Sequence, residues 1–260
     1  MCGRYMVTKP PDSIRRLFGT QGTLPNFPPR YNVAPTQDVP VVAINKEGHP
    51  AIVMMRWGLV PWWTETAKDG RPQSFKPLIN ARSETAASMP AFRDSFHERR
   101  CLIPADGYFE WDQTTDVRTP HLFRAPDQGL FAFAGLWDRW RAKGAERAQP
   151  PLLSCTILTT NASALVAPLH DRMPVILPQS AWSTWLGETK APDAAKQEQI
   201  LLDLLQPGGD EGFTDTEVST RVNSHLHDDE KIIDPSWSEP AHAPKSRTKK
   251  AADEGSGRLL

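Results

Sequence analysis

The sequence predicts an α+β fold, a compact single domain built mainly on antiparallel β-strands with short flanking helices. The 25 prolines are spread along the chain, and proline at this density breaks long helices and favours short strands joined by rigid turns. The predicted strands outnumber the predicted helices, and the two do not alternate as they do around a parallel sheet. No segment repeats at a fixed period.

The first part of the chain alternates short elements with turn-rich loops. Asp12 or Ser13 caps a first helix that Gly19 stops, and the turn Asn45–Gly48 joins an antiparallel pair of strands. The elements expected here are a helix at 11–19, a turn-rich stretch at 20–37, strands at 39–44 and 51–60, a loop at 61–77, and helices at 83–87 and 91–98.

Apolar strands dominate the second part, and two amphipathic helices follow them, the second with Ile200, Leu201, Leu204 and Leu205 on one face. The expected strands are 100–103, 108–112, 121–124, 130–136, 152–159 and 175–177, and the expected helices are 179–186 and 194–205. We expect one domain over residues 1–238. Residues 239–260 lack apolar periodicity and predict a disordered tail.

Composition excludes several classes of protein. Thirty basic and 31 acidic residues give a net charge of −1, which argues against coating duplex DNA by bulk charge but not against a local basic groove. No apolar run approaches the ~18 residues of a membrane span, and Arg4 and Lys9 interrupt any signal peptide. Three cysteines without a CxxC pair suit a reducing cytosol better than a disulfide framework.

Cys2 follows the initiator directly, in Met1-Cys2-Gly3-Arg4. Because cysteine is small, methionine aminopeptidases remove a Met that precedes it, which leaves an α-amine and a thiol on one residue. These groups titrate near ~8 and ~8.5, so both are partly available as nucleophiles at neutral pH. The alternative is an inert cysteine at a frayed terminus.

Three further segments indicate chemistry rather than packing. Asn80 lies in Pro77-Leu-Ile-Asn-Ala-Arg-Ser-Glu-Thr85 and Glu110 in Pro104-Ala-Asp-Gly-Tyr-Phe-Glu-Trp111, while His170 lies in Leu169-His-Asp-Arg-Met-Pro174. Alternation places Glu110 and Tyr108 on one face of a strand, and a carboxylate among aromatics loses hydration, which raises its pKa. Each residue has a structural alternative: a helix cap for Asn80, an arginine partner for Glu110 and a backbone carbonyl for His170.

These segments, with Arg30–Pro35, Trp57–Trp63 and Leu158–Asn161, occur in an order that closely resembles the SRAP (SOS response-associated peptidase) family of abasic-site processing proteins. The resemblance extends from Cys2 to about Pro235. It implies a compact β-rich α+β fold with a positively charged groove for DNA. It also implies that Cys2 crosslinks to the aldehyde of an abasic site in single-stranded DNA, with Asn80, Glu110 and His170 as the other catalytic residues.

The expected chemistry is a thiazolidine crosslink with associated lyase activity and removal of Met1. His170 opens the sugar, the Cys2 amine forms an imine while Glu110 protonates the departing hydroxyl, and the thiol closes the ring. Arginines that flank the segments are expected to bind phosphates, and the tryptophan pair to stack on bases unless it packs in the core. The predicted DNA contacts are Arg4, Trp62, Trp63, Arg82, Thr159 and Arg172.

We expect a monomer in the bacterial cytosol or at the nucleoid, with abasic single-stranded DNA as partner and no cofactor or metal. His225-Leu-His227-Asp228-Asp229 is interpreted as a polar loop, and Cys101 and Cys155 as core residues. Three alternatives stay open: a thiol peptidase acting on its own Met1, a class II glutamine amidotransferase, and a non-catalytic single-strand reader. Replacement of Cys2 tests the third alternative, because a protein that only binds single-stranded DNA keeps its function without this residue. The sequence lacks the Asn-Gly oxyanion pair of the amidotransferases, which argues against the second alternative.

Overall fold

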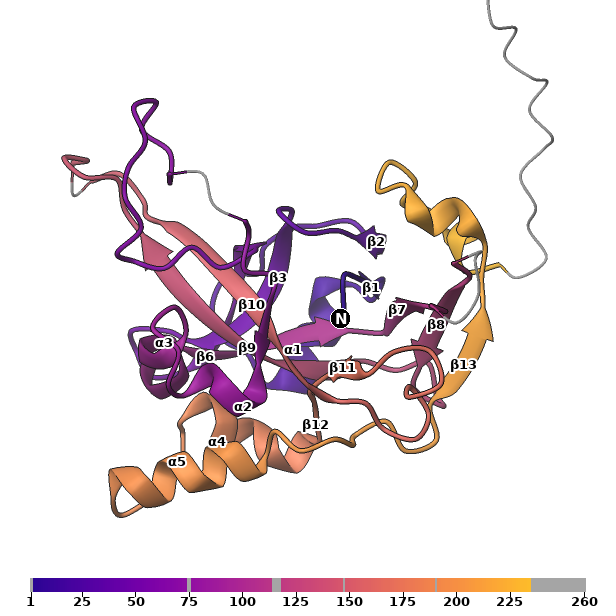
Figure 1. Ribbon diagram of the computed structural model, residues 1–260. Coiled ribbons are helices and arrows are strands. Elements are labelled where there is room, and N and C mark those ends of the chain that lie inside the picture. The colour runs from indigo at the N-terminus through magenta and orange to yellow at the C-terminus, as the bar shows by residue number, and fades with distance from the viewer. Residues whose placement is uncertain (1, 74–75, 114–117, 147, 190, 235–260) are drawn as a thin grey trace, which may run out of the picture.

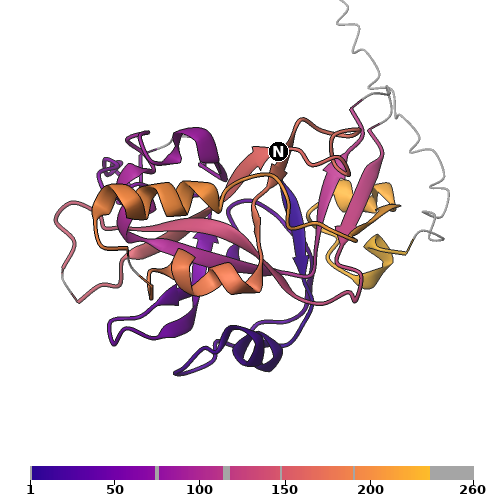
Figure 2. The same ribbon diagram turned by 90° about the horizontal axis from the view of Figure 1, so that it is seen from below.

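Short β-strands, most of them antiparallel, form the framework of the computed structural model, which describes residues 2–73, 76–113, 118–146, 148–189 and 191–234 (Figures 1 and 2). The predicted tail lies outside these residues. The strands are β1 (Arg4–Val7), β2 (Arg30–Val33), β3 (Asp38–Ile44), β4 (Pro50–Trp57), β5 (Asn80–Arg82), β6 (Arg100–Ala105), β7 (Gly107–Trp111), β8 (Pro120–Arg124), β9 (Phe131–Trp140), β10 (Leu152–Asn161), β11 (Arg172–Pro174), β12 (Ile176–Leu177) and β13 (Thr214–Glu217).

The helices are short and lie outside the sheets (Figure 1). They are α1 (Pro11–Phe18), α2 (Ser83–Ala86), α3 (Arg93–Glu98), α4 (Trp182–Leu186) and α5 (Ala194–Asp203), with single 3-10 turns at Gln179–Ala181, Thr220–Asn223 and Glu230–Ile232. Within the described ranges, no helix has both the length and the apolar character needed to cross a bilayer. The α+β class predicted from the sequence is confirmed.

Five strands close into a barrel. The hydrogen-bonded order is β10-β4-β3-β6-β9, and β9 pairs with β6 through residues 131–136 and with β10 through residues 135–140, which closes the ring. Most pairs are antiparallel, whereas β4 and β5 run parallel to β10. The barrel interior holds much of the core, including Cys101 and Cys155, which are fully buried as expected.

A second sheet, ordered β13-β8-β7-β1-β2, packs beside the barrel. Its outer face is covered by the segment 218–233, where Val218, Val222 and Ile232 pack on Met6 and Phe109. Tyr108 belongs instead to the main core. The alternation predicted for β7 is therefore confirmed, because neighbouring residues face different clusters.

The sequence pattern missed or misplaced several elements. Strands β1, β2, β5, β11 and β13 were not expected, since they are three or four residues long and β13 is exposed along its whole length. The predicted strand 51–60 ends at Trp57, because Gly58 adopts φ +127° and turns the chain. Conversely, β9 continues to Trp140 instead of ending at Leu136, because the hairpin with β10 extends its pairing.

Gly135 gives a test of barrel packing. A Cβ at this position would lie 2.9 Å from Cys101 Sγ and 2.9 Å from Ile103 Cδ1. Gly135→Ala should lower the free energy of unfolding by about 1–3 kcal/mol, the usual cost of overpacking, measured by urea denaturation. Cys101→Ala in the same chain should recover part of that loss because it removes one of the contacts. Parental stability of Gly135→Ala would show that the barrel is looser than described.

Candidate active site at the seam of the two sheets

Cys2 lies two residues before β1 of the second sheet, and its carbonyl is hydrogen-bonded to Asn80 of β5, which pairs with the barrel strand β10. Its side chain is fully buried, and its thiol donates a long contact of 3.8 Å to the carbonyl of Arg4. Burial raises the pKa of the Cys2 thiol far above its ordinary value, and the nearby Glu110 carboxylate raises it further. The thiol is therefore held in its neutral form.

Asn80 joins Cys2 to the barrel. It begins β5, which runs parallel to β10, and its Nδ2 donates a 2.9 Å hydrogen bond to the Cys2 carbonyl. Ile79 fixes this position, because its carbonyl accepts from Trp57 Nε1 at 2.9 Å and from Ile157 N at 3.1 Å. The buried Oδ1 of Asn80 has no hydrogen-bond partner in the part of the chain that the structure describes, so it can accept a hydrogen bond from an amine on Cys2.

Gly58, which follows Trp57 in a turn, lets the segment Pro77–Thr85 pack close to the turn. A Cβ on Gly58 would lie 3.0 Å from Pro77 Cβ, and its φ of +127° lies in the region that favours glycine. The Trp57–Trp63 and Pro77–Thr85 segments are thus adjacent in space for a backbone reason. The sequence placed them in one site only through the family resemblance.

Glu110 lies on β7, the strand beside β1. Arg4 pairs with Phe109, so Glu110 falls next to the residues that precede Arg4. Its side chain is only 2% exposed, and burial raises its pKa to about 7. The upward shift of this pKa matches the prediction made from the surrounding aromatic residues. A pKa of about 7 lets the carboxyl donate or accept a proton at neutral pH.

His170 lies in the turn that precedes β11, which pairs with the end of β10. Its Nδ1 accepts a 2.9 Å hydrogen bond from the backbone N–H of Arg172 and lies 2.8 Å from Asp171 Oδ1. Burial lowers the pKa of His170. This turn is close enough to β7 that the Asp171 charge raises the pKa of Glu110, which places all four predicted catalytic residues in one region.

The predicted DNA contacts differ in what their side chains already bind. Arg82 is exposed, and no hydrogen bond or ion pair occupies it among the described residues. Arg4 donates to Asn32 Oδ1 at 2.8 Å and to the carbonyls of Val222 and Asn223. Thr159 is fully buried. Arg172 is 8% exposed and is held by protein acceptors described below. Their contact with DNA stays a prediction, for which Arg82 is the arginine with its donors available.

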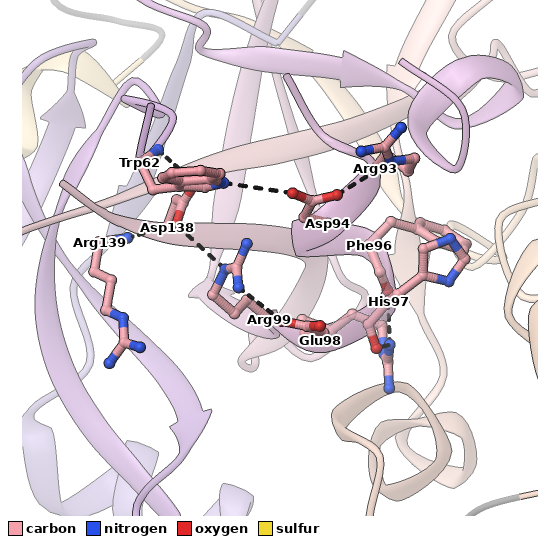
Figure 3. A network of polar contacts seen from close by, with 10 residues as sticks. Trp62, Arg93, Asp94, Phe96, His97, Glu98, Arg99, Asp138 and Arg139 are labelled. Carbon is pink, nitrogen blue, oxygen red and sulfur yellow. Dashed lines mark hydrogen bonds and ion pairs between the residues drawn. The ribbon is translucent and has the colours of Figure 1, made fainter. Parts of the chain in front are cut away.

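Trp62 and Trp63 are 56% and 53% exposed, so the alternative of core packing is wrong. A buried carboxylate fixes the loop that carries them: Asp138 Oδ2 accepts from the backbone N–H of Trp62 at 2.9 Å, and Oδ1 lies 3.3 Å from Arg99 Nε (Figure 3). Burial raises the pKa of Asp138. The Trp62 indole also contacts Asp94 at 3.4 Å, so the exposed rings stand on an anchored backbone.

The loop around His225 and His227 is structural. Asp228 accepts from Tyr31 N at 2.6 Å and Asn32 N at 2.8 Å and pairs with Arg30. Fully buried Asn32 donates to the carbonyls of Val222, Ser224 and His227. The interpretation as a polar loop holds, but these contacts tie it to β2. The roles of Asn32, Asp138 and Asp228 were missed, because a lone polar residue carries no sequence signal of a distant partner.

Comparison with known proteins decides the family. The sequence model described as SOS response associated peptidase (SRAP) matches residues 1–225. The chain belongs to the SRAP family. This SRAP protein is 35% identical over 238 residues to the abasic site processing protein YoqW of Bacillus subtilis, covering 90% of this chain and 99% of the relative. It is 29% identical to the abasic site processing protein HMCES of Xenopus tropicalis, over 86% of this chain and 75% of the relative.

Solved structures show the same fold. A protein from Bacteroides thetaiotaomicron, 22% identical, superposes with a TM-score of 0.76 over 91% of this SRAP chain and all of the other. A protein from Bordetella bronchiseptica, 28% identical, gives a TM-score of 0.68 over 84% of this chain and all of its own.

The raised pKa of Glu110 makes stability depend on pH. An unfolded glutamate titrates near ~4.3, so the unfolded state loses its proton first as pH rises, and the free energy of unfolding falls between about pH 4.3 and about 7. Each unit of difference between the pKa of Glu110 in the folded and the unfolded state changes the free energy of unfolding by roughly 1.4 kcal/mol. Glu110→Gln should therefore gain stability relative to the parent at pH 8 but little at pH 4, by urea denaturation. Glu47→Gln, on an exposed turn, is the control; an equal effect at both pH values would contradict the raised pKa.

Proposed function

We propose that this protein crosslinks abasic sites in single-stranded DNA through Cys2, after removal of Met1, and acts as a monomer. The observation that carries the proposal is the convergence of Cys2, Asn80 and Glu110 at one buried seam: a 2.9 Å hydrogen bond joins the first two, and electrostatic coupling joins Cys2 to Glu110. The names of the relatives from Bacillus and Xenopus supply the substrate class, abasic DNA.

The reaction balances without an oxidant or a cofactor. The abasic sugar opens to its aldehyde, the Cys2 amine attacks C1′, and loss of one water gives the imine. The Cys2 sulfur then bonds to C1′ while the thiol proton passes to nitrogen, which closes the five-membered thiazolidine. Ring closure is intramolecular, so the thiol acts at a high effective concentration.

The environment of Cys2 favours this order of events. A thiolate is disfavoured while the side chain is buried beside Glu110, so the thiol is a poor nucleophile for the first step. The amine needs only to be deprotonated and held, for which Asn80 Oδ1 offers an acceptor. The same raised pKa argues against a general thiol peptidase or an amidohydrolase, both of which need an activated thiol at the outset.

Glu110 and His170 take different proton transfers. With a pKa of about 7, Glu110 donates a proton to the hydroxyl that leaves as the imine forms. His170, neutral because burial lowers its pKa, exchanges a proton with the sugar oxygen during opening and reversal.

Two further activities accompany crosslinking in this proposal. Removal of a C2′ proton from the imine breaks the C3′–O3′ bond and cuts the strand, which is the lyase activity. Peptidase activity needs no substrate beyond the Met1–Cys2 bond, whose hydrolysis consumes one water and releases the amine that the crosslink requires.

Crosslinking should depend on a free amine at Cys2. One extra residue left ahead of Cys2 should abolish the DNA adduct, and Cys2→Ala should stop at an imine that borohydride traps. Intact mass distinguishes the products. The imine and the thiazolidine both form with loss of one water, but borohydride reduces only the imine, whose mass then rises by two hydrogens. Full crosslinking with the blocked amine would refute the thiazolidine mechanism, and full function of Cys2→Ala would favour a non-catalytic reader.

DNA affinity should separate the three arginines. Arg82→Ala should weaken binding to single-stranded DNA and reduce the salt slope by about 1 without changing stability, because it removes one phosphate contact. Arg4→Ala and Arg172→Ala should lower the melting temperature as well, since each breaks several internal hydrogen bonds. Arg16→Ala on α1, opposite the chain start in Figure 2, is the control. Equal crosslinking to single-stranded and fully paired abasic DNA would contradict the strand preference.

A further inference from the structure

Both terminal nitrogens of the Arg172 guanidinium donate to protein acceptors. Nη1 donates to Glu84 Oε1 at 2.6 Å and Asn161 Oδ1 at 2.9 Å, and Nη2 donates to Glu84 Oε2 at 2.9 Å and the Thr159 carbonyl at 2.6 Å. Four Nη hydrogens therefore meet four acceptors, and the fifth donor, Nε, is buried without a hydrogen-bond partner among the described residues. A DNA phosphate could reach this arginine only by displacing Glu84, so a role inside the protein fits the geometry better.

The backbone of the same residue holds His170. The N–H of Arg172 donates to His170 Nδ1, and a neutral imidazole that accepts there carries its proton on Nε2. Arg172 is the first residue of β11, a strand of three residues that pairs with β10 only through positions 159–161. So short a strand has few backbone hydrogen bonds of its own, and the Glu84 pair adds a second attachment.

We propose that Glu84 is a positioning residue for His170: it clamps Arg172, and the clamped backbone N–H of Arg172 sets the imidazole orientation and its Nε2–H tautomer. Glu84 belongs to α2, which begins immediately after the Asn80–Arg82 strand. The clamp thus connects the segment that holds Cys2 to the turn that holds the histidine. The catalytic role of His170 rests on the proposed function, whereas its positioning by Glu84 rests on the contacts described above.

The ion pair between Glu84 and Arg172 also affects the pKa of His170. Asp171 raises the pKa of His170 and Arg172 lowers it, besides the effects of burial and of the charge at the chain's amino terminus. Glu84 neutralises Arg172, and its own pKa is lowered chiefly by the hydrogen bond to that arginine. Loss of the Glu84 charge leaves a bare guanidinium beside the imidazole, which disfavours the imidazolium.

His170 has a partner for each protonation state. The neutral ring accepts from Arg172 N–H at Nδ1, whereas a protonated Nδ1–H can donate to Asp171 Oδ1 at 2.8 Å. Asp171 is 85% exposed, so water screens the second contact, and the partly buried hydrogen bond from the Arg172 N–H dominates near neutral pH. A ring with a partner in both states is suited to moving a proton without reorienting.

The test is a titration of His170 by imidazole 15N and 13C NMR in the full-length protein without DNA. Glu84→Gln keeps the shape and loses the charge; Glu84→Ala also loses the acceptors. In Glu84→Gln the His170 midpoint should move to lower pH, and Glu84→Ala should in addition weaken the Nε2–H signature as β11 loosens. The matched control is Glu198→Gln, which removes a glutamate that contacts a different histidine, His97, at 3.7 Å and should leave the His170 signals unchanged. His170→Gln assigns the resonance.

Crosslink kinetics provide the second readout. The pH profile of crosslink formation and reversal should shift in the same direction as the NMR midpoint in Glu84→Gln, with unchanged affinity for undamaged single-stranded DNA. An unchanged midpoint and tautomer in both Glu84 variants would overturn the proposal, as would weaker DNA affinity without an NMR change. A shifted midpoint with parental crosslink kinetics would uphold the clamp and show instead that His170 is not catalytic.

Discussion

The hydrogen bond from Asn80 Nδ2 to the carbonyl of Cys2 is the contact on which the site depends. It joins the first strand of one sheet to a short strand attached to the barrel, and neither strand is long enough to fix the chain start alone. Asn80 is itself held by β10, to which β5 and β11 are both paired. One barrel strand therefore sets the distance between Cys2, the Asn80 amide that holds it and the turn that carries His170.

Burial at that seam raises the pKa of both acidic groups. It keeps the Cys2 thiol protonated and Glu110 partly protonated near neutral pH, which in the proposed reaction delays attack by the thiol and lets Glu110 act as an acid. The same burial lowers the stability of the fold at high pH. The surrounding sheets must offset this cost, and the large shared core of aromatic and aliphatic side chains supplies the apolar burial that does so.

Much of the architecture could be predicted from local pattern, because prolines, turns and alternation report on the neighbouring residues. Strands such as β1, β5 and β11 could not, since three or four residues carry too little periodicity and exist only through pairing with distant strands. The same limit applies to the site: no spacing rule links residues 2, 80, 110 and 170, and only resemblance grouped them. Alternation did predict the environment of Glu110, whereas the closed barrel and the partners of Asp138 and Asn32 depend on contacts that no local pattern encodes.

The occupied arginines change how the DNA site is understood. Arg4, Arg82 and Arg172 all flank catalytic segments in the sequence, yet only Arg82 extends from the surface with its donors available. Arg4 ties β1 to the segment 218–233, and Arg172 ties β11 to α2. Two arginines next to the candidate site thus hold parts of the protein together. Glu84 neutralises Arg172, and the guanidinium of Arg4 donates to Asn32 Oδ1 and to the carbonyls of Val222 and Asn223, so both have their terminal donors engaged inside the protein. In the proposed function, selectivity for an abasic site arises from the buried chemistry of Cys2 and its neighbours, while Arg82 and the exposed tryptophans are the predicted contacts for DNA of any sequence.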